Sequence, residues 1–167
     1  ASHPGGRTRQ GSAPRSSSGG ESMSNPPDDQ TAFAVGADRF LVHALTPENL
    51  GILPNPDGYA NAAGACGDRM EIYLRLDDQV IADIRFMPEG CLHTVACGSA
   101  ITSLARGRDL AGASDIRAAA VDEQLGGLDR EHRHCAALAE AALKAAIRDA
   151  LKKRAEPAWK RVYRAGS

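Results

Sequence analysis

Three cysteines and one aspartate are the residues of this chain best suited to chemistry. They are Cys66, Asp68, Cys91 and Cys135, and His134 directly precedes the last of them. Thiolates accompanied by a carboxylate and an imidazole are ligands for a metal ion, and thiolates are also acceptors of sulfur. The sequence carries no secretory signature, so we expect free thiols in a reducing compartment rather than a disulfide framework.

The composition predicts one ordinary globular domain. The chain has 167 residues, of which 43% are hydrophobic and 25% charged, with a formal net charge of −1 and a pI of about 6.6. This balance gives no reason to expect nucleic acid or an anionic membrane as a partner. No apolar run approaches the roughly 18 residues of a membrane helix, so a cytoplasmic location is expected. The alternative interpretation of the cysteines is that all of them are small buried hydrophobic residues.

The chain is expected to have three parts. Residues 1–30 are rich in Gly, Ser and Pro and carry few apolar side chains, which predicts disorder. Met23 within this part is a candidate natural start, with residues 1–22 as an extension. Residues 31–157 are predicted to form the folded domain, with order beginning near Thr31, and residues 158–167 a basic tail.

Hydrophobic periodicity predicts the strands that position the candidate site. A short helix is expected at about 38–45, followed by an irregular loop as far as Gly58. Residues 69–87 predict a β-hairpin with a turn at 77–79, because apolar and polar side chains alternate in both halves. The apolar face is expected to carry Met70, Ile72, Leu74 and Leu76 from the first half, and Val80, Ala82, Ile84 and Phe86 from the second.

Helical patterns follow the hairpin. One helix is expected to start after Pro88 and end at Gly107, and one or two short helices lie within 109–125. The last helix is predicted from residue 136 to about 155, with Leu143, Ile147 and Leu151 on one face. Strands grouped first and helices grouped after them indicate an α+β domain.

These elements bring the cysteines close to one another. Cys66 precedes the hairpin and Cys91 follows it, so both lie at the end of the sheet opposite the turn. Cys91 and Cys135 each lie at or near a helix N-terminus, where unpaired N–H groups favour thiolate. Cys97 is about 240° around the helix from Cys91 and is expected to be a packed core side chain.

The order and spacing of these motifs resemble the NifU N-terminal domain, or IscU-like, family of iron–sulfur cluster assembly scaffolds. The similarity runs from about Phe40 to Lys153. The resemblance implies an α+β fold with a small three-stranded antiparallel sheet packed against several helices, including a long C-terminal helix. The matching pieces are Asn49-Leu50-Gly51, Cys66-Gly67-Asp68, Gly90-Cys91, Ala100-Ile101-Thr102, Arg106-Gly107-Arg108, His134-Cys135 and Leu138-Ala139-Glu140.

The resemblance also implies a scaffold rather than an enzyme. It implies that Cys66, Cys91 and Cys135 hold iron or a [2Fe–2S] cluster, with Asp68 as the modulating carboxylate and His134 as a second candidate for the fourth position. Persulfide sulfur would come from a cysteine desulfurase, with Cys135 or Cys91 as its acceptor. The cluster would then pass to apo iron–sulfur proteins, and a carboxylate or imidazole in the fourth position favours release because it binds iron less strongly than a thiolate.

Zinc gives two alternatives, because the same ligands suit tetrahedral Zn²⁺. The first is a zinc-binding sulfur-transfer partner of a cysteine desulfurase, in which the metal masks the thiolates. The second is a structural zinc domain that unfolds when the metal is removed.

Two segments depart from the family pattern. The Leu-Pro-Pro-Val-Lys segment that family members show to a dedicated Hsp70-type chaperone corresponds here to Leu128-Asp129-Arg130-Glu131-His132, which argues against chaperone-assisted transfer of that kind. After Cys91, the family's Gly-Ser-Ala run is replaced by Leu92-His93-Thr94-Val95-Ala96-Cys97. His93, two residues after Cys91, is a candidate substitute ligand, but we expect it on the helix surface or behind the ligands. His132 is expected to be solvated.

Overall fold

The computed structural model describes residues 38–165, so the predictions for residues 1–30 and for the onset of order near Thr31 lie outside the described range. The division of the chain into three parts stays a prediction. Within the described range, the first element is the expected short helix at 38–45. The elements that follow are β1 (Gly58–Ala63), β2 (Arg69–Asp77), β3 (Val80–Glu89), α2 (Leu92–Ala105), α3 (Leu110–Ser114), α4 (Ala118–Gln124), the 3₁₀ turn η1 (Arg130–His132), α5 (Arg133–Ala155) and α6 (Ala158–Ala165).

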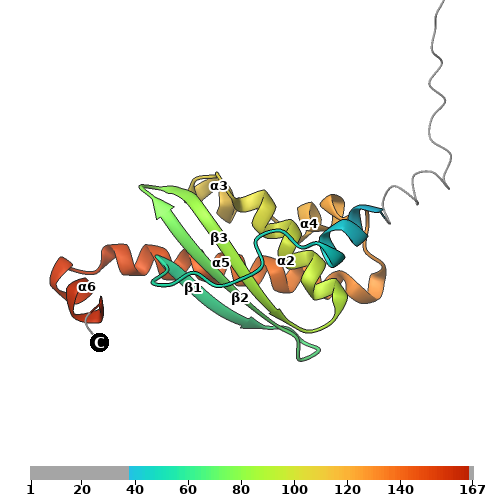
Figure 1. Ribbon diagram of the computed structural model, residues 1–167, viewed down its shortest axis with the longest axis horizontal. Helices are drawn as coiled ribbons and strands as arrows, with labels where there is room; N and C mark the ends of the chain where they lie inside the picture. The colour runs from blue at the N-terminus through green and yellow to red at the C-terminus, as the bar shows by residue number, and fades with distance from the viewer. Residues whose placement is uncertain (1–37, 166–167) are drawn as a thin grey trace, which may run out of the picture.

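The three strands form one antiparallel sheet in the order β1-β2-β3 (Figure 1). The hairpin expected at 69–87 is present, and its Arg69 pairs with Glu89 at the end opposite the turn. Strand β1 was not indicated by periodicity, because the sequence Gly-Tyr-Ala-Asn-Ala-Ala shows little hydrophobic alternation. The family resemblance implied this third strand, and the structure confirms it.

One face of the second hairpin strand differs from the expectation. Ile84 and Phe86 are fully buried as predicted, but Val80 is 40% exposed and Ile81 is buried in its place. The register shifts between Arg75 and Leu76, which pair with Asp83 and Ile81 and leave Ala82 as an extra residue. This β-bulge reverses the alternation at the start of β3, so the predicted inward orientation of Val80 and Ala82 is wrong.

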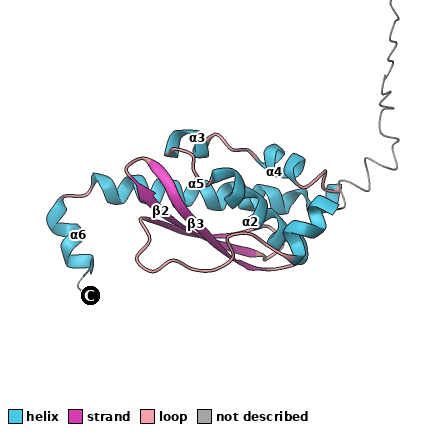
Figure 2. Ribbon diagram, turned by 45° about the horizontal axis from the view of Figure 1, so that its top comes forward, coloured by secondary structure: helices cyan, strands magenta, loops and turns pink. Residues whose placement is uncertain are grey.

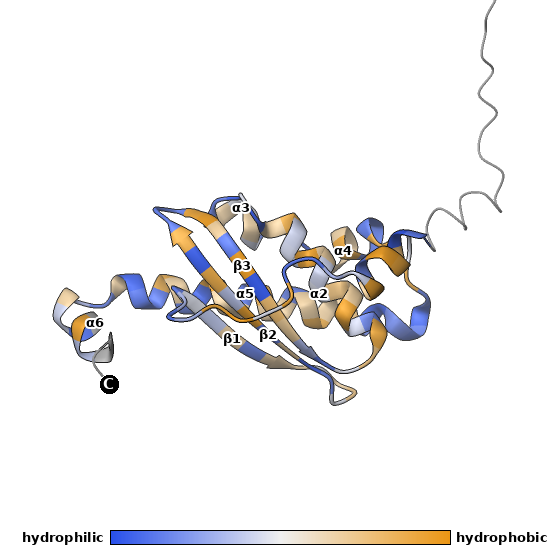
Figure 3. Cartoon of the chain, viewed as in Figure 1, coloured by the Kyte–Doolittle hydropathy of each residue, from blue (hydrophilic) through white to orange (hydrophobic). Residues whose placement is uncertain are grey.

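Helices cover a single face of the sheet. Helix α5 packs across β1 and β2, and α2 packs against β3 and against α5 (Figures 1 and 2). Strands β2 and β3 alternate between apolar and polar residues outside the bulge, as the hydropathy colours in Figure 3 show. The core therefore lies between the sheet and these two helices, with Met70, Ile72, Leu74, Ile84, Phe86, Ile101 and Leu143 among its fully buried side chains.

Helix α2 approaches the sheet closely because it carries a glycine at the contact. A Cβ atom built on Gly98 would lie 2.3 Å from ring carbons of Phe86, which is fully buried and cannot move aside. Glycine at this position therefore brings the N-terminal half of α2, and with it Cys91, against the end of β3.

The other predicted helices are present, but α5 begins at Arg133, three residues before the predicted start, and η1 and α6 were not predicted. Within the long helix, Leu143 and Ile147 are buried as expected, whereas Leu151 is 49% exposed and the neighbouring Ala150 is buried instead. The residues expected to form a basic tail contain helix α6, on which Trp159 and Tyr163 are exposed. No helix in the described range is both long enough and apolar enough to cross a membrane.

Candidate metal centre

Asp68, Cys91 and Cys135 meet at the end of the sheet where β2 begins and β3 ends. One ligand atom from each lies within 4.8 Å of the other two. The pairing of Arg69 with Glu89 brings Asp68 and Cys91 together, because each lies just beyond one of these strand ends. Cys135 reaches the same place from the first turn of α5. Small side-chain rotations would bring these three ligand atoms to the positions they need to share one tetrahedral metal ion.

The turn between β1 and β2 presents Cys66 and Asp68. The backbone N–H of Gly64 donates to the carbonyl of Asp68 at 2.7 Å, and Gly67 has a φ of 92° that a side chain would disfavour. Cys66 lies at the tip of this turn and is exposed. Its thiol is not one of the three ligands that converge within 4.8 Å, so it must swing inward to share an ion with them.

Cys91 is the N-cap residue of α2, as the sequence predicted. Its carbonyl accepts the N–H of Thr94 at 3.0 Å, while its thiol is exposed and lies 3.6 Å from Thr94 Oγ1. The preceding residue, Gly90, leaves room for the aspartate, because a Cβ there would lie 2.5 Å from the Asp68 carboxylate.

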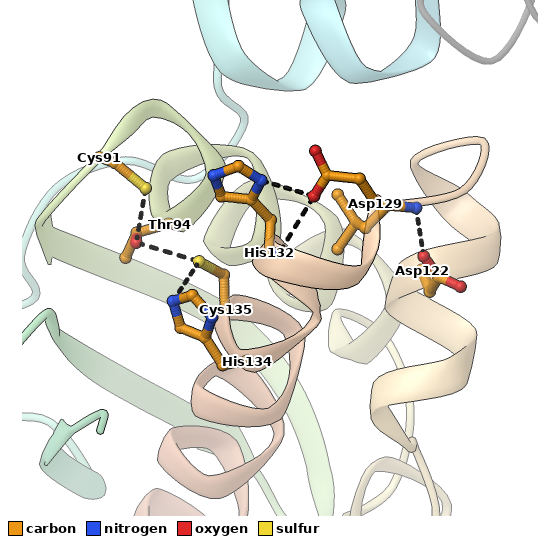
Figure 4. A network of polar contacts seen from close by, with 8 residues as sticks. Cys91, Thr94, Asp122, Asp129, His132, His134 and Cys135 are labelled. Atoms are coloured by element: carbon orange, nitrogen blue, oxygen red, sulfur yellow. Dashed lines mark hydrogen bonds and ion pairs between the residues drawn. The ribbon is translucent and has the colours of Figure 1, made fainter. Parts of the chain in front are cut away.

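Thr94 is the site residue that the sequence did not reveal. Its buried hydroxyl donates to Asp68 Oδ2 at 2.5 Å. The same hydroxyl lies 3.7 Å from Cys135 Sγ (Figure 4). The available signal was its position three residues after Cys91, which places both side chains on one side of the first helical turn.

The hydroxyl of Thr94 holds the pKa of the Asp68 carboxyl below its usual value. Burial opposes this effect, and further hydrogen bonds from the backbone N–H of Cys91 and from the thiols of Cys66 and Cys91 add to it. Asp68 is therefore ionised near neutral pH and is ready to act as a metal ligand.

Cys135 differs from Cys91 in being fully buried. Burial raises the pKa of its thiol to about 11, although the hydrogen bond from Thr94 acts in the opposite direction. His134 Nε2 lies 3.5 Å from Cys135 Sγ, which keeps this imidazole within reach of any ion bound at the sulfur (Figure 4). A metal ion is therefore needed to favour the Cys135 thiolate.

Cys97 lies in the core, as expected. Its side chain is fully buried within the main hydrophobic cluster, and burial raises the pKa of its thiol far above the usual range. It does not belong to the group that joins Cys91 and Cys135.

The structure corrects the expectation for His132. Its Nδ1 lies 2.6 Å from Asp129 Oδ1 (Figure 4). Its ring also stacks on that of His93 with centroids 3.5 Å apart, so it is half-buried rather than solvated. His93 also packs against Phe40 from the helix at 38–45, with ring centroids 4.7 Å apart.

Comparisons with known proteins agree with the resemblance seen in the sequence. The family model described as the NifU-like N-terminal domain matches residues 37–157. The iron-sulfur cluster assembly scaffold protein IscU 1 of Archaeoglobus fulgidus is 37% identical over 118 residues, which cover 70% of this chain and 77% of that protein. The IscU scaffold protein of Aquifex aeolicus is 34% identical over 119 residues, covering 70% and 76%. These relatives are named as scaffold proteins rather than enzymes, as expected for this chain.

A solved structure shows the same fold. The crystal structure of the N-terminal part of a NifU-like protein from Brucella abortus superposes with a TM-score of 0.58 and 24% identity, over 69% of this chain and 93% of that one. The family match spans most of the described residues and includes every candidate ligand. The chain belongs to the NifU-like N-terminal domain family.

Proposed function

We propose that this protein is an iron–sulfur cluster assembly scaffold that builds a labile [2Fe–2S] cluster and passes it to apo-proteins. The observation that carries the proposal is the convergence of Asp68, Cys91 and Cys135 within 4.8 Å at one end of the sheet, in a chain whose relatives are IscU scaffolds. We expect it to act in the cytoplasm, and the Leu128–His132 segment argues against a dedicated Hsp70-type chaperone as partner.

The cysteines supply the strong iron ligands. Cys91 and Cys135 are already within reach of a common ion, and Cys66 joins them when its glycine-flanked turn closes. Because Cys66 and Cys91 are exposed, iron and sulfur can enter and leave without opening the core.

Sulfur arrives by thiol exchange. A thiolate of this protein attacks the terminal sulfur of the desulfurase persulfide, so that a new S–S bond forms here, the old one breaks, and the desulfurase cysteine leaves as a thiolate. An external electron donor, such as a dithiol or a reduced electron-transfer protein, then reduces the persulfide sulfur to the sulfide of the cluster, which breaks the new S–S bond and frees the cysteine thiolate. Both Cys91 and Cys135 are candidates for this attack. Cys91 is exposed and can be reached directly, whereas the buried Cys135 needs a local opening or a bound metal that favours its thiolate.

The fourth position makes release possible. The Asp68 carboxylate and the His134 imidazole both lie beside Cys135, and each binds cluster iron less strongly than a fourth thiolate would. An acceptor protein that offers cysteine thiolates can therefore displace them.

Zinc supports a second candidate function, a sulfur-transfer partner of a cysteine desulfurase. The same convergent carboxylate and thiols fit a tetrahedral Zn²⁺ ion. Stimulation of a desulfurase by the zinc-loaded protein, with no cluster formed when iron is supplied, would favour this alternative over the scaffold.

Anaerobic reconstitution tests the proposal. The protein is incubated with Fe²⁺, cysteine, a cysteine desulfurase and a dithiol reductant, and the visible absorption of an iron–sulfur cluster is followed. We expect absorption in the wild type and its loss in Cys66→Ser, Cys91→Ser and Cys135→Ser, while Cys97→Ala retains it because Cys97 lies in the core. The absence of cluster absorption in the wild type would refute the proposal.

A further inference from the structure

Two histidines and an aspartate form a second group of metal-binding side chains beside the cysteine site. One ligand atom from each of His93, Asp129 and His132 lies within 4.8 Å of the other two. None of the three belongs to the group formed by Asp68, Cys91 and Cys135. The fold therefore places a nitrogen- and oxygen-rich site next to a sulfur-rich one.

Two parts of the fold hold this group, helix α2 and the 3₁₀ turn η1. His93 lies in the first turn of α2, where Phe40 packs against its ring. Asp129 is the N-cap residue of η1, and its Oδ1 accepts the backbone N–H of His132 at 3.0 Å. His132 ends η1, directly before α5. Asp129 and His132 are thus close in the sequence, and the group is completed because α2 places the ring of His93 against that of His132.

The ligand types specify a class of ion. Two imidazoles and one carboxylate suit divalent first-row transition metals, and with open positions they are the ligands typical of non-haem Fe²⁺. Asp129 is exposed and the two rings are half-buried, so an ion can reach the group from solvent. We propose that His93, Asp129 and His132 bind a divalent transition-metal ion, Fe²⁺ in a cluster scaffold, at a site separate from the cysteines.

Binding requires the two rings to turn. The planes of His93 and His132 are within 6° of parallel, whereas a metal ion lies in the plane of each imidazole that binds it. Rotation about side-chain bonds is enough to make the ring nitrogens converge, and it leaves the backbone of α2 and η1 in place.

The position of the group suggests a use for the ion. The ring of His134 lies 6.4 Å from that of His132, centroid to centroid, and its Nε2 lies 3.5 Å from Cys135 Sγ. A single side chain therefore separates the second group from the sulfur ligands. The ion could therefore be delivered from this group to the cysteines. This delivery rests on the proposed scaffold function, whereas binding of the ion to the group does not.

Metal binding without the cysteines tests the inference. The full chain with Cys66→Ala, Cys91→Ala and Cys135→Ala combined is dialysed anaerobically against Fe²⁺, and separately against Zn²⁺, and the bound metal is measured. We expect this variant to retain a single ion. Adding His93→Ala or His132→Ala should weaken binding at least ~100-fold, beyond the loss typical of a residue that only supports a ligand.

A matched control separates this group from its surroundings. Glu131→Gln, which changes an exposed carboxylate of η1 outside the group, should leave the retained ion unaffected, whereas Asp129→Asn should weaken it. The inference would be overturned if the cysteine-free variant bound no metal while its circular dichroism matched that of the wild type. The same weakening in Glu131→Gln as in His93→Ala would also overturn it.

A second measurement covers the case in which the cysteine-free variant does not fold. The wild-type protein should then bind one ion more than the His93→Ala/His132→Ala double variant, and equal stoichiometry would refute the second site. Failure of cluster assembly in the wild type would refute the scaffold and leave this result standing, so the two proposals fail separately.

Discussion

Thr94 donates a hydrogen bond to Asp68 across the candidate site, with 2.5 Å between Thr94 Oγ1 and Asp68 Oδ2. The same hydroxyl lies 3.6 Å from Cys91 Sγ and 3.7 Å from Cys135 Sγ. One buried side chain thus contacts all three converging ligands, and it fixes the carboxylate between two thiols before any ion arrives.

Thr94→Val should raise the pKa of Asp68 toward its ordinary value. The hydrogen bond from Thr94 is the largest cause of the lowered pKa, and valine keeps the shape of the side chain while removing the hydroxyl. An NMR titration of the Asp68 carboxyl carbon measures the change. Thr102→Val is the matched control, because it removes another buried hydroxyl of α2 that does not contact Asp68. An unchanged Asp68 pKa in Thr94→Val would contradict the role given to this hydroxyl.

The thiols should differ strongly in reactivity in the metal-free protein. Cys66 and Cys91 are exposed and should be alkylated first, whereas Cys135 is buried and its pKa of about 11 leaves about one thiol in 1,000 ionised at pH 8. The alkylation rate of Cys135 should therefore rise about tenfold per pH unit up to its pKa. Mass spectrometry of each cysteine peptide follows the reaction. Alkylation of Cys135 at pH 8 as fast as that of Cys91 would be inconsistent with this burial.

Glu140 should stabilise the fold in a pH-dependent way. It joins α4 to α5, since its carboxylate accepts the N–H of Ala118 at 2.7 Å and the ammonium of Lys144 at 2.5 Å. The hydrogen bond from Lys144 is the first cause of its lowered pKa. This contribution is present above the unfolded pKa and is lost as pH falls through the lower folded pKa.

Glu140→Gln should therefore lower the free energy of unfolding by about 1 kcal/mol at pH 7, and by less as the pH falls below the folded pKa of Glu140. Urea titrations of the wild type and the variant, at pH 7 and at a pH below the folded pKa of Glu140, measure the change in the free energy of unfolding. Glu123→Gln, which changes an exposed carboxylate of α4, serves as the control. An effect of Glu140→Gln that is equally large in acid would show that its charge is not responsible.

Asp68→Ala should slow cluster release from the loaded scaffold. A carboxylate ligand exchanges more readily than a thiolate, so its removal takes away the position at which an acceptor thiolate enters. The decay of cluster absorption in the presence of an apo-acceptor measures the rate, with Glu89→Ala at the exposed end of β3 as the control. Faster release from Asp68→Ala would contradict the labilising role.

Much of this fold could be predicted from local patterns. Alternation in 69–87 gave the hairpin, and the helical stripe after Pro88 placed Cys91 at a helix N-terminus, because both signals arise from side chains within a few residues of each other. The bulge at Ala82 and strand β1 escaped detection. Their conformations depend on pairing with β2 and on packing beneath α5, which no short window of sequence records.

The candidate site divides in the same way. Cys66, Asp68, Cys91 and Cys135 were identifiable from residue type and from the resemblance, and the structure brings three of them together. Thr94 gave only a weak signal, since a threonine in the first turn of a helix is common. The contact of His93 with His132 depends on how α2 packs against η1, so sequence reasoning placed both side chains in solvent or behind the ligands.

The most direct test of the scaffold proposal follows iron and sulfur together. The protein is loaded anaerobically by a cysteine desulfurase with isotopically labelled iron and sulfur-labelled cysteine, and is then mixed with an apo-form [2Fe–2S] acceptor. We predict that both labels reach the acceptor at the same rate and in equal amounts, as expected for transfer of an intact cluster. Arrival of labelled sulfur without labelled iron would contradict the scaffold and support the zinc-binding sulfur-transfer alternative.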